Sequence, residues 1–331
     1  MGLRFFDPKA GLRDGDYPNR VYALVDSVEE IDEETATIVF DCVEADWIDE
    51  ISPDAPPFAD RVPGTDAGEY PLPDREISIV TIERSDLGIS VAQSDWIELA
   101  LADVDEDGEV GQSFNLFADP IPRRLNKAEP VTGDTLTKLN HVAGWGTVEA
   151  DTEADIAAEL NRRSADALAI YDVGQGAATA FLSGGAPILY FDIGGSAIGN
   201  QRSFPAHLTQ FCFSCNPPIV LSHWDWDHWS SAMRDPRALT QSWVLPDQRS
   251  TGSLGTTHAT FLAQLKAQAR KIMWWPPSLQ SVRVSRLDAT VHRANGNPKS
   301  RNETCLAVLR DRAGGRLARS VFLPGDAPFG G

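Results

Sequence analysis

The feature that most restricts the fold is a short, wholly apolar segment that ends in a run of charged side chains. Pro218-Ile219-Val220-Leu221 contains no polar side chain, and after Ser222 the chain continues as His223-Trp224-Asp225-Trp226-Asp227-His228. A short strand without apolar–polar alternation is typical of a sheet that is covered on both faces. In such layered sheets, ligand sites gather where strands end. The sequence therefore predicts a layered α/β domain with a polar site beside this strand.

The charged run contains four strong metal ligands within six residues: His223, Asp225, Asp227 and His228. His223 and Asp225 are two residues apart, so an extended backbone would point both side chains the same way. Asp227 and His228 are adjacent and would point differently, which favours two metal ions side by side over one closed cage. Imidazole and carboxylate suit Zn²⁺, and also Mn²⁺ or Fe²⁺. The alternative is a polar loop that only caps the next helix.

Strands and helices alternate through the second half of the sequence, as expected of an α/β layered domain. Helices are predicted at 152–167, where Thr152 can cap the first turn with Asp155 as its partner, and at 257–272. Strands are predicted at 168–171, 178–182, 187–191, 218–221, 242–246, 282–287, 304–309 and 320–323. We interpret 151–167 as a linking helix and 168–331 as the layered domain.

The first half has a different character. Short stretches at 20–25, 35–40, 76–82 and 96–101 alternate apolar and polar residues, which predicts a small β-rich domain over 1–150 without a helix. Residues 1–150 contain 33 acidic and 11 basic residues, a balance of −22, whereas 151–331 contain 15 and 18, a balance of +3. The net charge of −19 argues against a nucleic-acid partner for the whole chain, but the second half alone does not. The acidic domain would suit a protein partner.

Two further motifs are interpreted as structural. The pattern D-x-D-x-D-G at 103–108 resembles the start of a calcium loop, but Phe114 stands where a bidentate Glu is required, so an acidic turn is favoured. Cys212 and Cys215 form one isolated CxxC. A structural zinc needs four ligands, and a redox pair would be expected at the start of a helix. We predict that these two cysteines are buried small side chains just before a strand.

The sequence favours a cytoplasmic location. It contains no run of about 18 apolar residues, so neither a membrane span nor a membrane partner is expected. The first residues lack the layout of a signal peptide. Four cysteines are too few for a disulfide framework in 331 residues.

The charged run resembles the H-x-H-x-D-H motif of the metallo-β-lactamase superfamily, with Asp225 in place of the second His. Other segments resemble family elements in the same order. The segment 172–176, D-V-G-Q-G, is similar to the opening of the hydrolase domain in ComEC-type DNA-uptake proteins, and 190–194 is similar to the strand-ending I-D-x-G element. The segments 302–306 and 323–326 resemble the N-x-S-L-V and L-x-G-D elements. The resemblance covers about residues 168–331.

This resemblance implies a metallo-β-lactamase-like αββα layered domain over 168–331, preceded by the small β-rich domain. It also implies two metal ions, most simply zinc. His223 and Asp225 would hold the first ion, Asp227 and His228 the second, and Asp326 would bridge both.

The resemblance assigns supporting roles as well. Asp192 would orient a ligand imidazole, and Asp172 would shape the turn beside the site. In ComEC-type proteins a His-His-Gly segment follows the G-D element, but only five residues follow Asp326 here, so the domain looks truncated at its C-terminus. His258 and His292 are the remaining candidates for a further metal ligand, with a capping or surface role as the alternative for each.

The implied activity is hydrolysis by a metal-bound water, with Asp227 and His228 as the catalytic pair and a phosphodiester, including nucleic acid, as the substrate. Two alternatives remain open. The same chemistry would serve a lactam, a thioester or a lactone. The missing C-terminal histidine would also suit a metallo-β-lactamase-fold binding or regulatory module without turnover.

Overall fold

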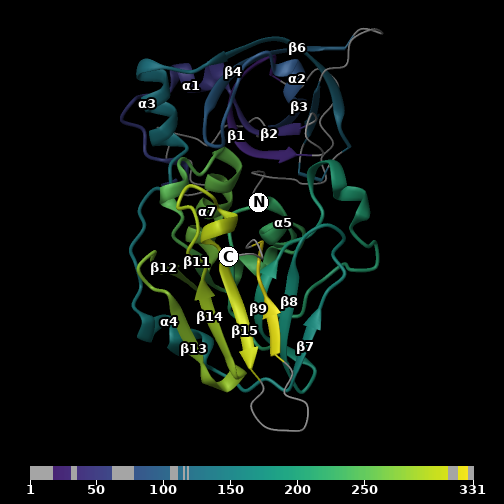
Figure 1. Cartoon of the computed structure of the whole chain (residues 1–331), viewed down its shortest axis with the longest axis vertical. Coiled ribbons are helices and arrows are strands. Elements are labelled where there is room, and N and C mark those ends of the chain that lie inside the picture. The colour runs from purple at the N-terminus through teal and green to yellow at the C-terminus, as the bar shows by residue number, and fades with distance from the viewer. Residues whose placement is uncertain are drawn as a thin grey trace. The chain divides into compact units, whose positions relative to one another are not determined.

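A computed structural model describes residues 18–30, 36–61, 78–104, 111–114, 116–117, 119–311 and 320–326 (Figure 1). The chain forms two compact units. The first comprises Met1–Thr147 and Ser253–Ala267, and the second comprises Val148–Gly252 and Gln268–Gly331. The mixture of helices and several sheets confirms the predicted α/β content. Most of the acidic turn predicted at 103–110 lies outside the described residues.

The first unit contains a closed barrel of antiparallel strands in the order β1-β2-β3-β5-β6-β4. Alternate residues of each strand face one core, as Val21, Ala23 and Val25 of β1 and Ile38 and Phe40 of β2 do. The barrel confirms the β-rich character predicted for this half. Its strands are β1 (Arg20–Glu30), β2 (Ala36–Glu44), β3 (Ser78–Glu83), β4 (Trp96–Asp103), β5 (Gly111–Phe114) and β6 (Ile121–Pro130).

Helices also occur in the first unit, so the prediction of no helix in the first half was wrong. α3 buries Leu139 and Val142, and its first turn carries Asp134, which complements the helix dipole. The apolar positions of α3 are few, which explains why the segment was overlooked. The helices of this unit are α1 (Ala45–Glu50), α2 (Arg84–Leu87), α3 (Gly133–Val142) and α7 (Thr256–Gln268).

Buried polar contacts attach α7 to the barrel, although the segment 257–272 was predicted as part of the second domain. Asp41 of β2 accepts hydrogen bonds from Thr256 Oγ1 and Thr257 N, each at 2.9 Å. His258 Nε2 lies 3.1 Å from Asp26 Oδ1 of β1. All of these side chains are buried. Because buried polar groups need such partners, these contacts explain why α7 belongs to the first unit.

The buried carboxyl group of Asp41 predicts an unusual pH dependence of the protein's stability. Burial, and then the nearby charge of Asp26, together raise the pKa of Asp41 to about 7. A folded-state pKa above the unfolded value of about 3.9 contributes stability that is complete below about pH 4 and is lost as the pH rises through about 7. The shift corresponds to roughly 4 kcal/mol. Asp41→Asn lacks this titration. Between about pH 5 and about pH 8, the difference in unfolding free energy between Asp41→Asn and the wild type should therefore shift in favour of the variant by a few kcal/mol, as measured by urea unfolding.

The exposed Asp86 supplies a matched control, because Asp86→Asn removes a carboxylate without touching the buried contacts. Its stability difference from the wild type should change little between the two pH values. If the unfolding free energies of the wild type and of Asp41→Asn changed with pH in parallel, the raised pKa of a buried Asp41 would be contradicted.

Among its described residues, the second unit contains two sheets. One is six-stranded, in the order β12-β11-β10-β9-β8-β7, and the other is antiparallel, in the order β13-β14-β15-β16. β9, β10, β11 and β12 pair in parallel. Parallel pairing is the arrangement expected of apolar strands that are buried on both faces. The strands are β7 (Ala167–Ile170), β8 (Ala178–Ser183), β9 (Ala186–Ile193), β10 (Ile219–Val220), β11 (Ser242–Pro246), β12 (Lys271–Trp275), β13 (Ser281–Val284), β14 (Ala289–Arg293), β15 (Leu306–Asp311) and β16 (Ser320–Leu323).

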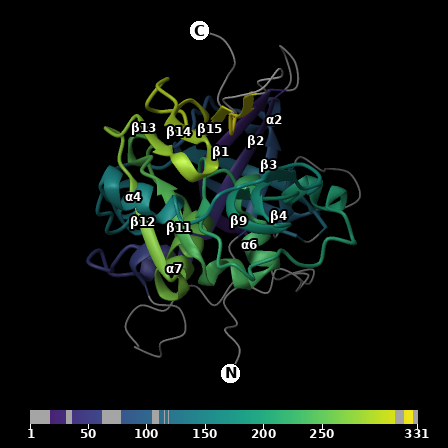
Figure 2. The ribbon, with the colours of Figure 1, turned by 90° about the horizontal axis from the view of Figure 1, so that it is seen from below.

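The two sheets share one hydrophobic core, and Figure 2 shows β13 to β15 as one layer and β9, β11 and β12 as another. Phe181 and Val244 of the first sheet and Val291 and Val308 of the second all belong to this core. β12 is not among the predicted strands, and its first two residues fall within the helix predicted at 257–272, whereas α7 ends at Gln268.

The helix predicted at 152–167 is α4 (Glu153–Leu160), and Thr152 Oγ1 accepts a hydrogen bond from Asp155 N at 3.2 Å, as predicted. Ile156 and Leu160 of α4 lie in the shared core, so α4 is an element of the second unit. Two further helices, α5 (Trp226–Trp229) and α6 (Ser231–Arg234), follow β10. None of the helices in the described ranges combines the length and the hydropathy that a membrane crossing requires.

Candidate metal centre

Three parts of the second unit supply the polar side chains of the candidate site. Asp192 stands near the end of β9, and His223 stands three residues after the end of β10. β9 and β10 are parallel neighbours, so their carboxyl ends meet at one edge of the sheet. Asp225 precedes α5, and His228 lies within it. Asp326 follows β16.

The five predicted metal ligands come together around the carboxylate of Asp326. One of its oxygens lies 3.4 Å from His228 Nε2, and the other lies 3.7 Å from His223 Nε2. Ligand atoms of these three residues lie within 4.8 Å of one another. Asp225 Oδ2 is 3.1 Å from His223 Nε2, and Asp227 Oδ1 is 3.8 Å from His228 Nε2. Each histidine therefore has its own second carboxylate.

The donor set and its spacing fit metal ions. Two ligand atoms that share a tetrahedral zinc at about 2.1 Å lie about 3.4 Å apart, close to the distances found here. His223 Nε2 is buried and has no hydrogen-bond partner among the described residues, because the nearby carboxylate of Asp225 does not meet hydrogen-bond geometry. A buried ring nitrogen that faces carboxylates without bonding to them is suited to coordinate a cation.

Asp192 and Ser222 fix the orientation of the two imidazoles. Asp192 is fully buried; its Oδ1 accepts a hydrogen bond from Ser222 N at 2.7 Å, and its Oδ2 lies 2.9 Å from His228 Nδ1. Ser222 Oγ lies 3.0 Å from Nδ1 of both His223 and His228. With hydrogens on both Nδ1 atoms, the Nε2 lone pairs face Asp326. The contact of Asp192 is the one that the resemblance implied, whereas Ser222 was overlooked despite its place directly before His223.

The electrostatics of the cluster favour bound positive charge. Burial would lower the pKa of His228, but carboxylates, foremost that of Asp192, outweigh burial and hold this pKa well above its ordinary value. Burial raises the pKa of Asp227. Burial also opposes ionisation of Asp225, yet the charge of His223 holds the pKa of Asp225 well below its usual range. A cation, whether a proton or a metal ion, is therefore stabilised at the ring nitrogens.

Arg301 was not identified from the sequence. Its side chain is almost completely buried, and its Nη1 lies 3.4 Å from Asp225 Oδ1. The carbonyl of Arg301 accepts a hydrogen bond from Gln248 Nε2 at 2.7 Å, which fixes the backbone here. Arg301 thus offsets the negative charge that Asp225 adds where an imidazole was expected. No local pattern marks Arg301, because the fold alone brings it to Asp225.

Glycines of two predicted motifs let the backbone approach Asp227 closely. The carbonyl of Asp227 accepts hydrogen bonds from Ala177 N and Gly195 N, both at 3.0 Å. A Cβ atom on Gly194 would lie 1.6 Å from this carbonyl oxygen, and one on Gly176 would lie 2.5 Å from it. Gly176 also has a φ of +133°, which side chains rarely adopt. The glycines in D-V-G-Q-G and D-I-G-G therefore position the helix that carries Asp227.

Three other predicted residues lie outside the ligand cluster. Asp172 Oδ1 accepts a hydrogen bond from Gly174 N at 3.2 Å, so Asp172 shapes its own turn. His258 belongs to the first unit and contacts Asp26. His292 is half-buried on β14 between β13 and β15. Neither histidine joins the potential metal ligands that the described residues bring together.

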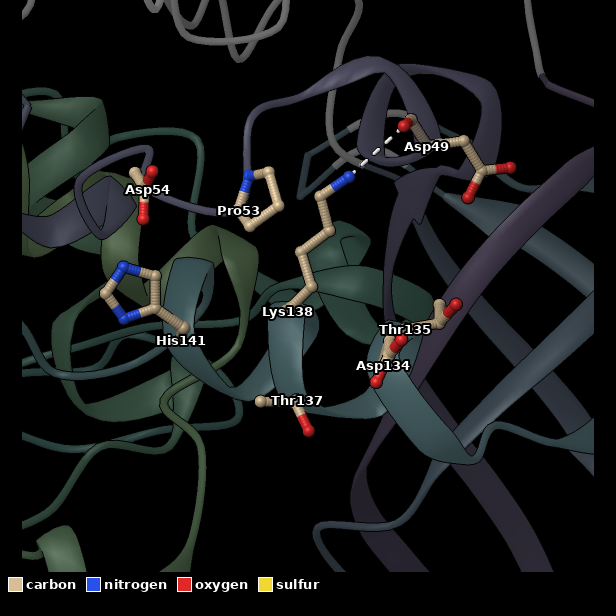
Figure 3. Close-up of a pocket in the computed structure, with 8 residues that line it drawn as sticks. All are labelled: Asp49, Pro53, Asp54, Asp134, Thr135, Thr137, Lys138 and His141. Atoms are coloured by element: carbon tan, nitrogen blue, oxygen red, sulfur yellow. Dashed lines mark hydrogen bonds between the residues drawn. The ribbon is translucent and has the colours of Figure 1, made fainter.

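A separate cavity of about 850 Å³ is lined by residues of the first unit alone. Figure 3 shows Lys138 pointing toward the backbone of Asp49, to whose carbonyl it donates a hydrogen bond at 3.2 Å. His141 Nε2 lies 2.9 Å from the carbonyl oxygen of Ala55. The side chains of Lys138 and His141 are thus both tied to backbone, and Asp54 and Asp134 are exposed. The cluster around Asp326 is the stronger candidate for catalysis.

Comparisons of the chain with protein-family models, with curated proteins and with solved structures found no match. The geometry of the five potential ligands, and of the residues that orient them, therefore carries the functional assignment. Fold alone would not identify a substrate, because one fold hosts many chemistries.

Proposed function

We propose that the second unit is a metal-dependent hydrolase of the metallo-β-lactamase type, with a dinuclear site that acts on a phosphodiester. The observation that carries this proposal is the division of the Asp326 carboxylate between His223 and His228, each of which has a second carboxylate nearby. Such a set of imidazoles and carboxylates suits two Zn²⁺ ions, and it also suits Mn²⁺ or Fe²⁺.

The proposal includes the αββα layering of this superfamily for the second unit. Two sheets that share one core, with Ile156 and Leu160 of α4 packed into it, support that layering. A cluster at the carboxyl ends of parallel strands supports it too.

The five ligand side chains would be shared between the two metal ions. His223 and Asp225 would hold one ion, Asp227 and His228 the other, and Asp326 would contact both. When bound, the ions would polarise the scissile bond and lower the pKa of a bound water to about 7.

Residues around the ligands would keep this arrangement in place. Asp192 and Ser222 would hold the two rings in the tautomer that leaves Nε2 free to coordinate. Arg301 would limit the excess negative charge beside an anionic substrate. Each role follows from a contact described above.

A phosphodiester is the favoured substrate for two reasons. The segment 172–176 resembles the opening of ComEC-type hydrolase domains, and residues 151–331 carry a balance of +3, unlike the acidic first half. Lactams, thioesters and lactones are alternatives at the same metals.

The test uses the full chain loaded with Zn²⁺ or Mn²⁺ and a panel of substrates: single- and double-stranded nucleic acids, bis-p-nitrophenyl phosphate, and representative lactams, thioesters and lactones. We expect phosphodiester cleavage, and we expect Asp227→Ala to reduce it at least about a hundredfold, because losing a metal ligand removes several kcal/mol of transition-state stabilisation.

Glu153→Gln is the matched control, since Glu153 is an exposed carboxylate of the same unit at the start of α4. It should retain full activity. Unchanged phosphodiester cleavage by Asp227→Ala would contradict the proposed site. Metal binding without turnover of any substrate in the panel would instead favour a binding or regulatory module.

A further inference from the structure

The CxxC segment of the second unit lies at the surface, so the predicted burial was wrong for Cys212, whereas Cys215 packs against the shared core. Cys212 is exposed, Cys215 is half-buried, and both are free thiols. Asn216 N donates a hydrogen bond to Phe213 O at 2.9 Å, so the chain turns at Ser214 and Cys215. The pair does precede β10, as predicted.

Each of the two sulfur atoms lies within hydrogen-bond distance of a polar side chain. Arg163 Nη1 donates a hydrogen bond to Cys215 Sγ at 3.1 Å. Cys212 Sγ lies 3.3 Å from Ser214 Oγ. Hydrogen bonds from Ser214, and then the positive charge of Arg237, lower the pKa of Cys212. Partly exposed thiols in an electropositive setting are the reactive ones in proteins.

The other two cysteines differ from Cys212 in exposure and in the direction of their pKa shifts. Cys42 and Cys305 are fully buried. Burial raises the pKa of Cys305 to about 11 and that of Cys42 well above its ordinary value. The chain therefore contains two inert thiols against which the reactivity of the surface pair can be measured.

We propose that Cys212 and Cys215 form a redox-active dithiol that a low-molecular-weight disulfide, such as glutathione disulfide, converts to an intramolecular disulfide. The inference rests on the exposure, the spacing and the cationic neighbours of the pair, and it is independent of metal binding and hydrolysis.

The exchange proceeds in two balanced steps. The thiolate of Cys212, the more exposed residue, attacks one sulfur of the small disulfide; a mixed disulfide forms and one small thiolate leaves. The thiolate of Cys215 then attacks the Cys212 sulfur, which closes the intramolecular disulfide and releases the second small thiolate. Two cysteine thiols are oxidised, one small disulfide is reduced, and the two protons that the cysteine thiols lose are taken up by the two released small thiolates, which become thiols.

The test exposes the folded full chain to glutathione disulfide, blocks remaining thiols with an alkylating reagent, and maps the peptides by mass spectrometry. We expect a Cys212–Cys215 disulfide, with Cys42 and Cys305 blocked only after unfolding. Cys215→Ser should accumulate the mixed disulfide at Cys212. Cys212→Ser should react at least about tenfold more slowly than the wild type, because the activated thiol is gone.

Arg163→Met tests the second step separately. Without the guanidinium, Cys215 Sγ loses the hydrogen bond that holds it in place, so the mixed disulfide at Cys212 should persist longer than in the wild type. Circular dichroism confirms that each variant is folded. The proposal is overturned if folded wild-type protein forms no Cys212–Cys215 disulfide, or if Cys212 is alkylated no faster than the two buried cysteines.

Discussion

His223→Ala should leave the second unit unable to retain its full complement of metal. The change removes the one buried ring nitrogen of the cluster that has no hydrogen-bond partner among the described residues. Plasma emission spectroscopy should find two ions per wild-type chain and a clear deficit in the variant. Saturating Zn²⁺ should also stabilise the wild type, by about 4 kcal/mol at a thousandfold excess over the dissociation constant, whereas the variant should lose most of this effect.

His292→Ala is the control, because His292 lies on β14, outside the ligand cluster. Its metal content and its stabilisation by zinc should match those of the wild type. If His223→Ala bound two ions with unchanged stabilisation, coordination by His223 would be ruled out.

Gly194→Ala should disrupt the second unit more than any other small substitution near the site. Its Cβ atom would lie 1.6 Å from the carbonyl oxygen of Asp227, so either β9 or α5 must move. Backbone cannot yield as a flexible side chain can, and we expect a loss of about 3–5 kcal/mol in the free energy of unfolding. Urea unfolding measures this loss, and metal titration of the folded fraction should show weaker binding, because Asp227 and His228 shift with α5.

Gly184→Ala separates this steric effect from the ordinary cost of replacing a glycine. Gly184 has a φ of +59°, but its Cβ atom would meet nothing within 4 Å. It should cost only about 1 kcal/mol, from backbone strain alone. If the two variants lost similar amounts of unfolding free energy, the clash between a Cβ atom at Gly194 and the carbonyl oxygen of Asp227 would have no measurable cost.

The sequence was most informative where the relevant interactions are local. The apolar segment before His223 predicted a buried strand, and β10 is that strand. Thr152 and Asp155 predicted the start of α4 within a single turn of helix. The approach of Asp326 to the cluster was anticipated only through resemblance, since Asp326 lies about a hundred residues further along the chain.

Features that depend on distant partners could not be predicted from the sequence. Arg301 reaches Asp225 only because the second unit folds around both. The attachment of α7 to the barrel depends on Asp26 and Asp41, which lie more than 200 residues before it. The surface position of Cys212 escaped prediction too: with zinc and redox roles set aside, the pair was interpreted as buried, whereas Cys212 lies exposed beside the turn at Ser214.

The attachment of α7 has a consequence for the order of events during synthesis. The ribosome completes α3 at Val142, but the last part of the first unit, Ser253–Ala267, emerges more than a hundred residues later. At about 5–20 residues per second, the delay is on the order of 10 s. During that time Thr256 and Thr257 are absent, so the hydrogen bonds that they donate to Asp41 cannot form. The nascent barrel therefore cannot reach its final packing until most of the second unit has been translated.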